Sequence, residues 1–295
     1  MVHANHQAGD RRRATALVAA AYACSGVLAL LVGRALEDTH PVLVAFAADC
    51  AATVAVFAFS MAFDNSSFYD AYWSVLPFPL VAYWAAVAPP EANAARQALV
   101  LLLLGAWGLR LTWNWYRQWQ GLGHEDWRYV DIRRSSGRAW PLASLAGIHF
   151  FPTLLVFAAL LPAWQAVQSP RPLGFLDFAA FAVGAGATVV EAVADEQLRR
   201  HVRERRDHGE ILASGLWKYS RHPNYFGENS FWWGIALFGV AVGPAWWSLA
   251  GAVAMTALFV FVSVPLLDRR SLERRPGYRE HMERVPGLLP RLPRD

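Results

Sequence analysis

The sequence Lys218-Tyr-Ser-Arg-His-Pro-Asn-Tyr-Phe-Gly-Glu228 is a polar, charged segment that leads directly into the apolar residues 231–242. Pro223 suits the first position of a helix, because its φ angle is already set and it has no N–H to leave unsatisfied. Ser220 or His222 could cap that helix. The segment therefore predicts a helix that starts at a membrane surface.

Two features of this helix start indicate a binding site. The free N–H groups of its first turn lie next to Arg221, and this combination suits a phosphate or pyrophosphate. Asn224 and Glu228 are four residues apart and share a helical face, so a carboxylate lies about one turn into the helix. A charge in hydrocarbon is costly and usually marks a site, although a capped, snorkelling interfacial turn would give the same pattern.

The composition predicts an integral membrane protein, since 55% of the residues are hydrophobic and mean hydropathy is +0.22. We expect an all-α, polytopic transmembrane helix bundle of about eight helices. The predicted spans are residues 14–32, 41–63, 71–88, 94–115, 142–164, 174–194, 225–242 and 246–267. Cys24 and Cys50 both fall in apolar segments, so we expect neither a disulfide framework nor a cysteine-based metal site.

The distribution of basic residues favours one orientation. With both termini in the cytoplasm, the inner segments hold three, five, seven and eight basic residues, which is 23 of the 27. These residues cluster beside apolar segments, so the net charge of +4 indicates topology rather than nucleic-acid binding. Lys218 is the one lysine among them, a bias typical of a GC-rich genome, and we predict a bacterial plasma-membrane protein.

Other polar residues are expected at the cytoplasmic face. Arg110, Asn114 and Arg117 form a polar stripe on one predicted helix, which should face a water-filled cavity. Glu191 and Asp195 are four apart and place two carboxylates on one face of another helix. Salt bridges to nearby arginines are the alternative for this pair.

Four segments have structural interpretations. Gly-Ala-Gly at residues 184–186 has no strand before it, so it indicates close helix packing rather than a dinucleotide site. Asp70 is a plausible N-cap for a helix starting at the next residue. Residues 121–129 are interpreted as a folded surface turn, with metal ligands or general acids as alternatives, and His149 as a hydrogen-bonded core histidine.

Three separated motifs resemble a known family. They are Arg110-Leu-Thr-Trp-Asn-Trp-Tyr-Arg117, Gly121-Leu-Gly-His-Glu-Asp-Trp-Arg-Tyr129 and Tyr219-Ser-Arg-His-Pro-Asn-Tyr-Phe-Gly-Glu228. Together they resemble a bacterial membrane family related to steroid 5α-reductases, whose C-terminal domain is shared with C14 and C24 sterol reductases and isoprenylcysteine carboxyl methyltransferases. The resemblance implies a tail and first helix at residues 1–40, followed by a reductase-like membrane domain at residues 41–295 with its cofactor site at the cytoplasmic side.

The resemblance also implies an enzyme that uses NADPH to reduce a carbon–carbon double bond in a lipophilic, steroid-like or enone substrate. The proton donor is left open between Tyr116, Tyr69, Asp70 and water. The implied catalytic residues are Tyr116 and Glu228, and no metal is expected. The implied cofactor-binding residues are Arg117, Glu191, Asp195, Lys218, Tyr219, Arg221, His222, Asn224, Tyr225, Glu228, Arg270 and Tyr278.

The alternative activity is S-adenosylmethionine-dependent methylation of a lipid-linked substrate. The related methyltransferases typically carry an uncharged residue at the position of Glu228, so this residue favours the reductase. Expected partners are the lipophilic substrate and membrane lipids, and the oligomeric state is left open. The arginines of the C-terminal tail, such as Arg284, are expected to attract anionic lipid and to have no part in cofactor binding.

Overall fold

The computed structural model describes residues 2–205, 207, 209–243 and 246–292, with side chains from residue 10 onward. These described residues form helices and turns and contain no strand, which confirms the predicted all-α class. The chain divides into two compact units, Met1–Pro90 with Trp107–Ala158, and Glu91–Ala106 with Ala159–Asp295. Two helices contribute residues to both units: α5 (Ala94–Gln118) and α8 (Phe151–Gln168).

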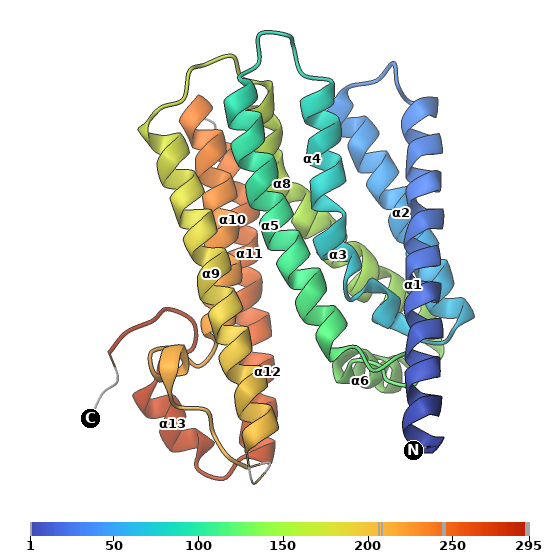
Figure 1. The fold of residues 1–295 in the computed structure, drawn as a ribbon, viewed down its shortest axis with the longest axis vertical. Coiled ribbons are helices and arrows are strands. Elements are labelled where there is room, and N and C mark those ends of the chain that lie inside the picture. Colours follow the sequence, from blue (N-terminus) through green and yellow to red (C-terminus); the bar gives the residue numbers. More distant parts are fainter. Residues whose placement is uncertain (1, 206, 208, 244–245, 293–295) are drawn as a thin grey trace. The chain divides into compact units, whose positions relative to one another are not determined.

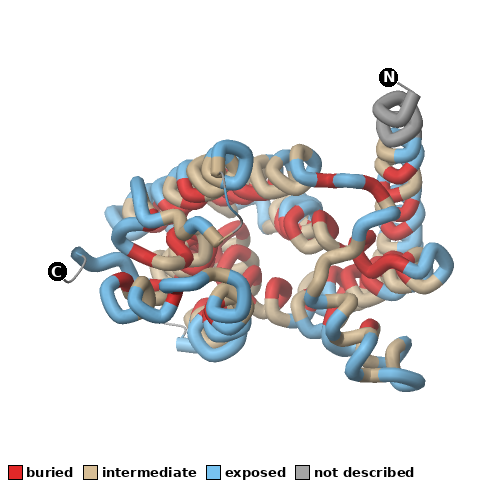
Figure 2. The backbone as a smooth tube through the Cα atoms, turned by 90° about the horizontal axis from the view of Figure 1, so that it is seen from below, coloured by how far each residue is buried: buried red, intermediate tan, exposed pale blue. Residues whose placement is uncertain are grey.

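Six helical stretches in the described part of the chain are long and apolar enough to cross a membrane. They are Asp10–Ala35, Pro41–Ala62, Ala94–Gln118, Trp127–Gln168, Phe175–Glu204 and Trp246–Arg274. Their outward faces carry large exposed apolar side chains, including Leu30, Leu109 and Phe261, as lipid contact requires. In Figure 2 exposed and buried positions alternate along the helices, which is the pattern of a one-sided packing face. The polytopic helical fold is therefore as predicted.

The number of spans differs from the predicted eight. Residues 71–88 divide into α3 (Tyr72–Val75) and α4 (Pro77–Ala86), because Pro77 starts a new helix. Ten residues at about 1.5 Å each are too short to cross the hydrocarbon core. Helix α10 (Pro223–Val242) has the length of a span, but Asn224, Glu228 and Asn229 make its first half polar.

The first unit is built on the packing of α1 (Val2–Ala35) against α2 (Pro41–Ala62), coloured blue in Figure 1. Ala14, Val18 and Ala21 lie on one face of α1 and belong to a core that also contains Val56 of α2. The remaining elements are η1 (Ser66–Tyr69), α3, α4, the end of α5, α6 (Trp127–Ser136), η2 (Gly137–Ala139), α7 (Trp140–Ala143), the π-helical η3 (Ser144–Phe150) and the start of α8.

The second unit is built on α9 (Phe175–Glu204) and α10, which pack along their length. Helix α11 (Ala250–Leu258) packs on α10 and continues through the π-helical η6 (Phe259–Ser263) into α12 (Val264–Arg274). The short elements are η4 (Gly215–Lys218), η5 (Trp246–Leu249) and α13 (Tyr278–Arg284). Figure 1 shows α13 beside the end of α12, away from the bodies of α9 and α10.

A buried ion pair closes one end of this unit. Arg96 is fully buried and donates from Nε to Asp177 Oδ1 at 2.7 Å and from Nη2 to Asp177 Oδ2 at 3.1 Å. Its other donors reach the main-chain carbonyls of Ser169, Arg171 and Pro172. Because the guanidinium is paired and hydrogen-bonded on all sides, the charge is tolerated and the start of α5 is fixed to the loop before α9.

Candidate functional site

The site in the second unit begins at the N-terminus of α10. Pro223 is the first residue of the helix and His222 its N-cap, as predicted, although the His222 side chain makes no capping hydrogen bond. Ser220 instead accepts from the His222 N–H at 3.1 Å and donates to the carbonyls of Gly287 and Leu288. The turn before the helix is therefore held from both sides.

Asp268 of α12 is the centre of a buried polar cluster. It accepts from Arg221 Nε at 3.2 Å, from Arg221 Nη2, from His222 Nε2 at 3.0 Å and from the Tyr278 hydroxyl at 2.8 Å. The Arg221 and Asp268 side chains are only 9% and 7% exposed. Burial and the nearby Asp268 charge raise the pKa of Tyr278 to about 12, so its hydroxyl remains a donor at neutral pH. Three of the predicted site residues thus meet at a fourth that the sequence had not indicated.

The chain after α13 adds a further restraint. Residues 286–291 run along residues 219–222, with Arg221 N donating to Pro286 O at 2.8 Å and Arg291 N to Tyr219 O at 3.1 Å. Arg221 Nη1 also donates to the carbonyls of Met282 and Val285. The guanidinium of Arg221 therefore bonds protein acceptors and fixes the helix start, and the phosphate contact expected from the sequence stays a prediction.

A buried polar face runs along the contact between α9 and α10. Asn224 Nδ2 donates to Asp195 Oδ1 at 3.2 Å, which joins the two helices. One turn further into α10, Glu228 is 5% exposed and accepts from Trp232 Nε1 at 2.7 Å. Glu191, one turn from Asp195 on α9, is 4% exposed. The two predicted i,i+4 pairs therefore lie on adjoining helices.

Glycine permits the close approach of these helices. A Cβ added at Gly227 would lie 2.7 Å from the Glu191 Cβ and 2.9 Å from the Ala187 carbonyl oxygen. Seven residues on, a Cβ at Gly234 would lie 2.8 Å from Gly184 N. Gly227 lies against Glu191, whereas Gly234, further along α10, lies against Gly184, which is earlier in α9. The two helices are therefore antiparallel. The packing role predicted for Gly184 is confirmed.

The other predicted residues of this unit lie around the same helix start. Tyr225 stacks on His222, with ring centroids 5.8 Å apart, and contacts Phe259. Tyr219 is 38% exposed and lies below the Lys218 ammonium. Arg270 is half-buried on α12, two residues after Asp268.

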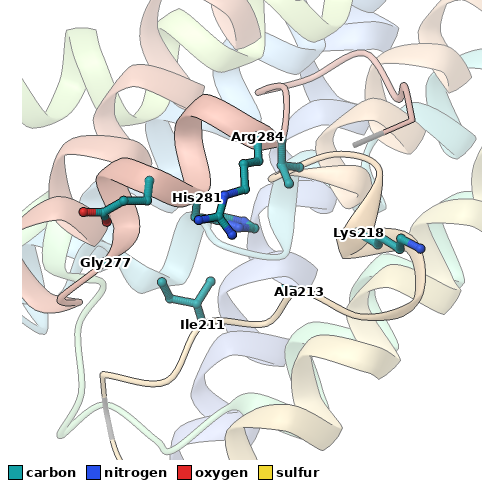
Figure 3. A pocket seen from close by; sticks show the side chains of 8 residues that line it. Ile211, Ala213, Lys218, Gly277, His281 and Arg284 are labelled. Carbon is teal, nitrogen blue, oxygen red and sulfur yellow. The ribbon is translucent and has the colours of Figure 1, made fainter. Parts of the chain in front are cut away.

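An open pocket of about 540 Å³ adjoins this cluster (Figure 3). Its lining includes Lys218 and two residues that the sequence analysis had not placed in a site, His281 and Arg284 of α13. Burial and the neighbouring charge of Arg221 lower the pKa of His281, so its ring is neutral at pH 7. His281 and Arg284 are three residues apart in the sequence, which places them on one face of a helix. Nothing in the sequence singles out these two as site residues, because they lie in a short segment rich in other charged residues.

In the first unit, the two predicted residues at the end of α5 have local partners. Tyr116 is 40% exposed, and the Arg11 guanidinium lies 4.9 Å from the centre of its ring. Arg117 is half-buried and donates from Nη2 to Asn114 Oδ1 at 3.1 Å, so two members of the predicted polar stripe are bonded to each other.

Residues 121–129 fold onto the loop at residues 64–70. Asn65 donates to the carbonyls of Leu122 and His124, and Ser66 N donates to Glu125 Oε1 at 2.7 Å. The folded turn predicted for this motif is confirmed.

The N-cap role predicted for Asp70 is wrong. Helix α3 has Ala71 at its N-cap and no side-chain cap, because the Asp70 carboxylate accepts from the Tyr129 hydroxyl at 2.9 Å. Burial raises the pKa of Asp70 to about 7.

A second buried polar cluster lies in the first unit and was not anticipated. The Tyr69 hydroxyl is bonded to Thr153 Oγ1 at 2.7 Å, and Thr153 is bonded to Thr53 at 3.1 Å. Asp49 and Tyr72 lie beside them, and a cavity of about 10 Å³ is lined in part by Asp49, Tyr69, Tyr72 and Thr153. The sequence signal for this cluster was Asp49, a carboxylate within an apolar helix.

His149 is a hydrogen-bonded core histidine, as predicted. Its ring nitrogens are bonded to the Ser60 hydroxyl and to the carbonyl oxygen of Ser144.

The fold and these two clusters define a class of protein, a polytopic α-helical membrane protein with polar residues buried inside its helical units. The comparisons with known proteins then give the family. Residues 56–285 match the family described as "Protein of unknown function (DUF1295)", and the chain belongs to it. This range includes the α9–α10 face, the Asp268 cluster and the pocket under α13.

One relative is the "Uncharacterized protein C594.04c" of Schizosaccharomyces pombe (strain 972). It is 26% identical over 253 residues, which cover 77% of this chain and 73% of the relative. No solved structure matches the chain at a significant level.

Proposed function

We propose that this protein is a membrane-embedded reductase that uses NADPH to reduce a carbon–carbon double bond in a lipophilic, steroid-like or enone substrate. The observation that carries the proposal is the polar face shared by α9 and α10. Glu191 and Glu228 are both at least 95% buried there, and the Asn224–Asp195 hydrogen bond lies one turn away. Buried charges in membrane proteins are costly and are kept mainly where they bind or react.

The residues of this unit suit NADPH chemically. A nicotinamide carboxamide both donates and accepts hydrogen bonds, and Asn224 and Glu228 offer an amide and a carboxylate one turn apart. Lys218 and Arg270 supply cations for the phosphates, while the Asp268 cluster holds the helix start in position. When bound, NADPH supplies the hydride.

The buried cluster of the first unit suits the polar end of the substrate. A cavity of about 10 Å³ accepts roughly one water or one oxygen atom. Burial raises the pKa of Tyr69, so its hydroxyl keeps its proton and can donate to a ketone oxygen there. A hydrogen bond from the Tyr69 hydroxyl would stabilise the negative charge that develops on that oxygen while a conjugated double bond accepts the hydride.

Among the proton donors that the sequence left open, this geometry favours Tyr69. Tyr116 is 40% exposed and in contact with the Arg11 guanidinium, and the Asp70 carboxylate accepts a hydrogen bond from Tyr129. Tyr69 is 2% exposed and borders the cavity.

The test is NADPH binding by the purified full-length chain, with Glu228→Gln as the variant. Glu228→Ala would leave Trp232 Nε1 without its acceptor and cost roughly 1–3 kcal/mol of stability, so glutamine is the cleaner change. We expect NADPH affinity to fall about tenfold in Glu228→Gln. The matched control is Glu196→Gln on α9, because the Glu196 side chain is 47% exposed and pairs with Arg199.

Mass spectrometry of ligands co-purified in mild detergent separates the two activities. A retained dinucleotide supports the reductase. Retained S-adenosylmethionine or its demethylated product would instead select methylation of a lipid-linked substrate. Equal NADPH affinity in parent and Glu228→Gln would remove Glu228 from the site.

A further inference from the structure

The pocket under α13 has a definite chemical character. Glu280, His281 and Arg284 line it from one face of that helix, together with the cap residues Gly277 and Val285. Its volume of about 540 Å³ is within the range of small-molecule sites. Helix α13 lies outside the six candidate spans, so the pocket belongs to the part of the unit beyond the apolar helices.

The charged groups lie on separate elements around the pocket. Arg284 comes from α13 and Lys218 from the end of η4, and both side chains are exposed. Figure 3 shows the Arg284 side chain directed toward Ile211, and the Lys218 side chain on the opposite side of the view with its ammonium turned away from Arg284. Glu280 is the acidic group of the lining.

The remaining wall is apolar. Ile211 and Ala213 approach from the segment after α9, and Val285 closes the end of α13. The pocket therefore combines a guanidinium, an ammonium and a neutral imidazole with a short apolar surface. This combination suits a compact anion attached to a flat or apolar group.

We propose that this pocket is a phosphomonoester site, with Arg284 as the bidentate ligand and Lys218, whose flexible side chain can turn toward the ligand, as the second cation. In the reductase proposed above, on which this assignment of the ligand rests, the phosphomonoester is the 2′-phosphate on the adenosine of NADPH. Ile211 then contacts the adenine. Arg284 and Lys218 thereby select NADPH over NADH, because NADH has no charge at that position.

Calorimetric titration of the full-length chain in detergent with adenosine 2′,5′-bisphosphate and with adenosine 5′-monophosphate tests this assignment. Arg284→Gln is expected to weaken the bisphosphate about tenfold and the monophosphate by less than about threefold. Arg279→Gln is the matched control, since Arg279 is an exposed arginine of the same helix outside the pocket lining. Bisphosphate affinity that is unchanged in both Arg284→Gln and Lys218→Gln would overturn the site.

These probes contain no nicotinamide, so the result is independent of the redox step. Bisphosphate binding that depends on Arg284 supports the site even if no reduction is ever observed. If Arg284→Gln reduces substrate with NADPH as well as the parent does, the phosphomonoester site is refuted but the proposed function is not. A parallel titration uses nanodiscs with phosphatidic acid or with phosphatidylcholine alone. Arg284-dependent binding only to phosphatidic acid, and none to the bisphosphate, would overturn the nucleotide assignment in favour of a lipid headgroup.

Discussion

Replacing Asp268 by alanine is expected to destabilise the second unit severely. The Arg221 guanidinium and the His222 ring would lose their carboxylate while remaining buried, with side chains 9% and 7% exposed. Removing one partner of a buried ion pair typically costs about 3–5 kcal/mol, because the other charge is left uncompensated. Tyr278 would also lose its acceptor. We therefore expect a loss of about 4 kcal/mol in the free energy of unfolding.

The assay is reversible unfolding of the full-length chain in mixed micelles of mild detergent and sodium dodecyl sulfate, monitored by tryptophan fluorescence. The matched control is Glu273→Ala on the same helix. Glu273 pairs with Arg269 four residues away, but these side chains are 62% and 82% exposed, and such pairs contribute less than about 0.5 kcal/mol. If Asp268→Ala lies within about 1 kcal/mol of the parent, the cluster does not hold the helix start and the reasoning is refuted.

Two further predictions concern the helix contact and the tail. Gly227→Ala is expected to lower the free energy of unfolding by about 1–3 kcal/mol, because its Cβ would force α9 and α10 apart. Gly186→Ala is the control and should be neutral or stabilising, because a Cβ there would have nothing within 4 Å. Equal free energies of unfolding for the two variants would contradict the close contact. Because burial lowers the pKa of His281, its contribution to stability is present above pH 6.5 and is lost as the pH falls below that value. Chemical unfolding at pH 7.5 and 5.0 should show a smaller pH dependence in His281→Gln than in the parent, and identical slopes would count against this burial.

The predictions that succeeded depend on chemistry that is local in sequence. Pro223 begins α10 because proline is preset for the first helical turn, whatever surrounds it. Gly184 packs against α10 because small residues in an apolar helix let the backbones of two helices approach closely. The apolar runs determine an all-α membrane fold because a spanning backbone must satisfy its own hydrogen bonds.

The partners of the charged residues could not be obtained in this way. Arg221 beside a helix N-terminus has the pattern of a phosphate ligand, and nothing in that pattern indicates that two of its nitrogens bond Asp268, 47 residues later. Asp70 has the pattern of an N-cap, but Tyr129, 59 residues later, engages its carboxylate. A charged side chain bonds whichever opposite group the fold brings within about 3 Å, and that choice depends on how distant segments pack. Local pattern therefore determined where the polar residues lie along each helix, and packing determined which of them meet.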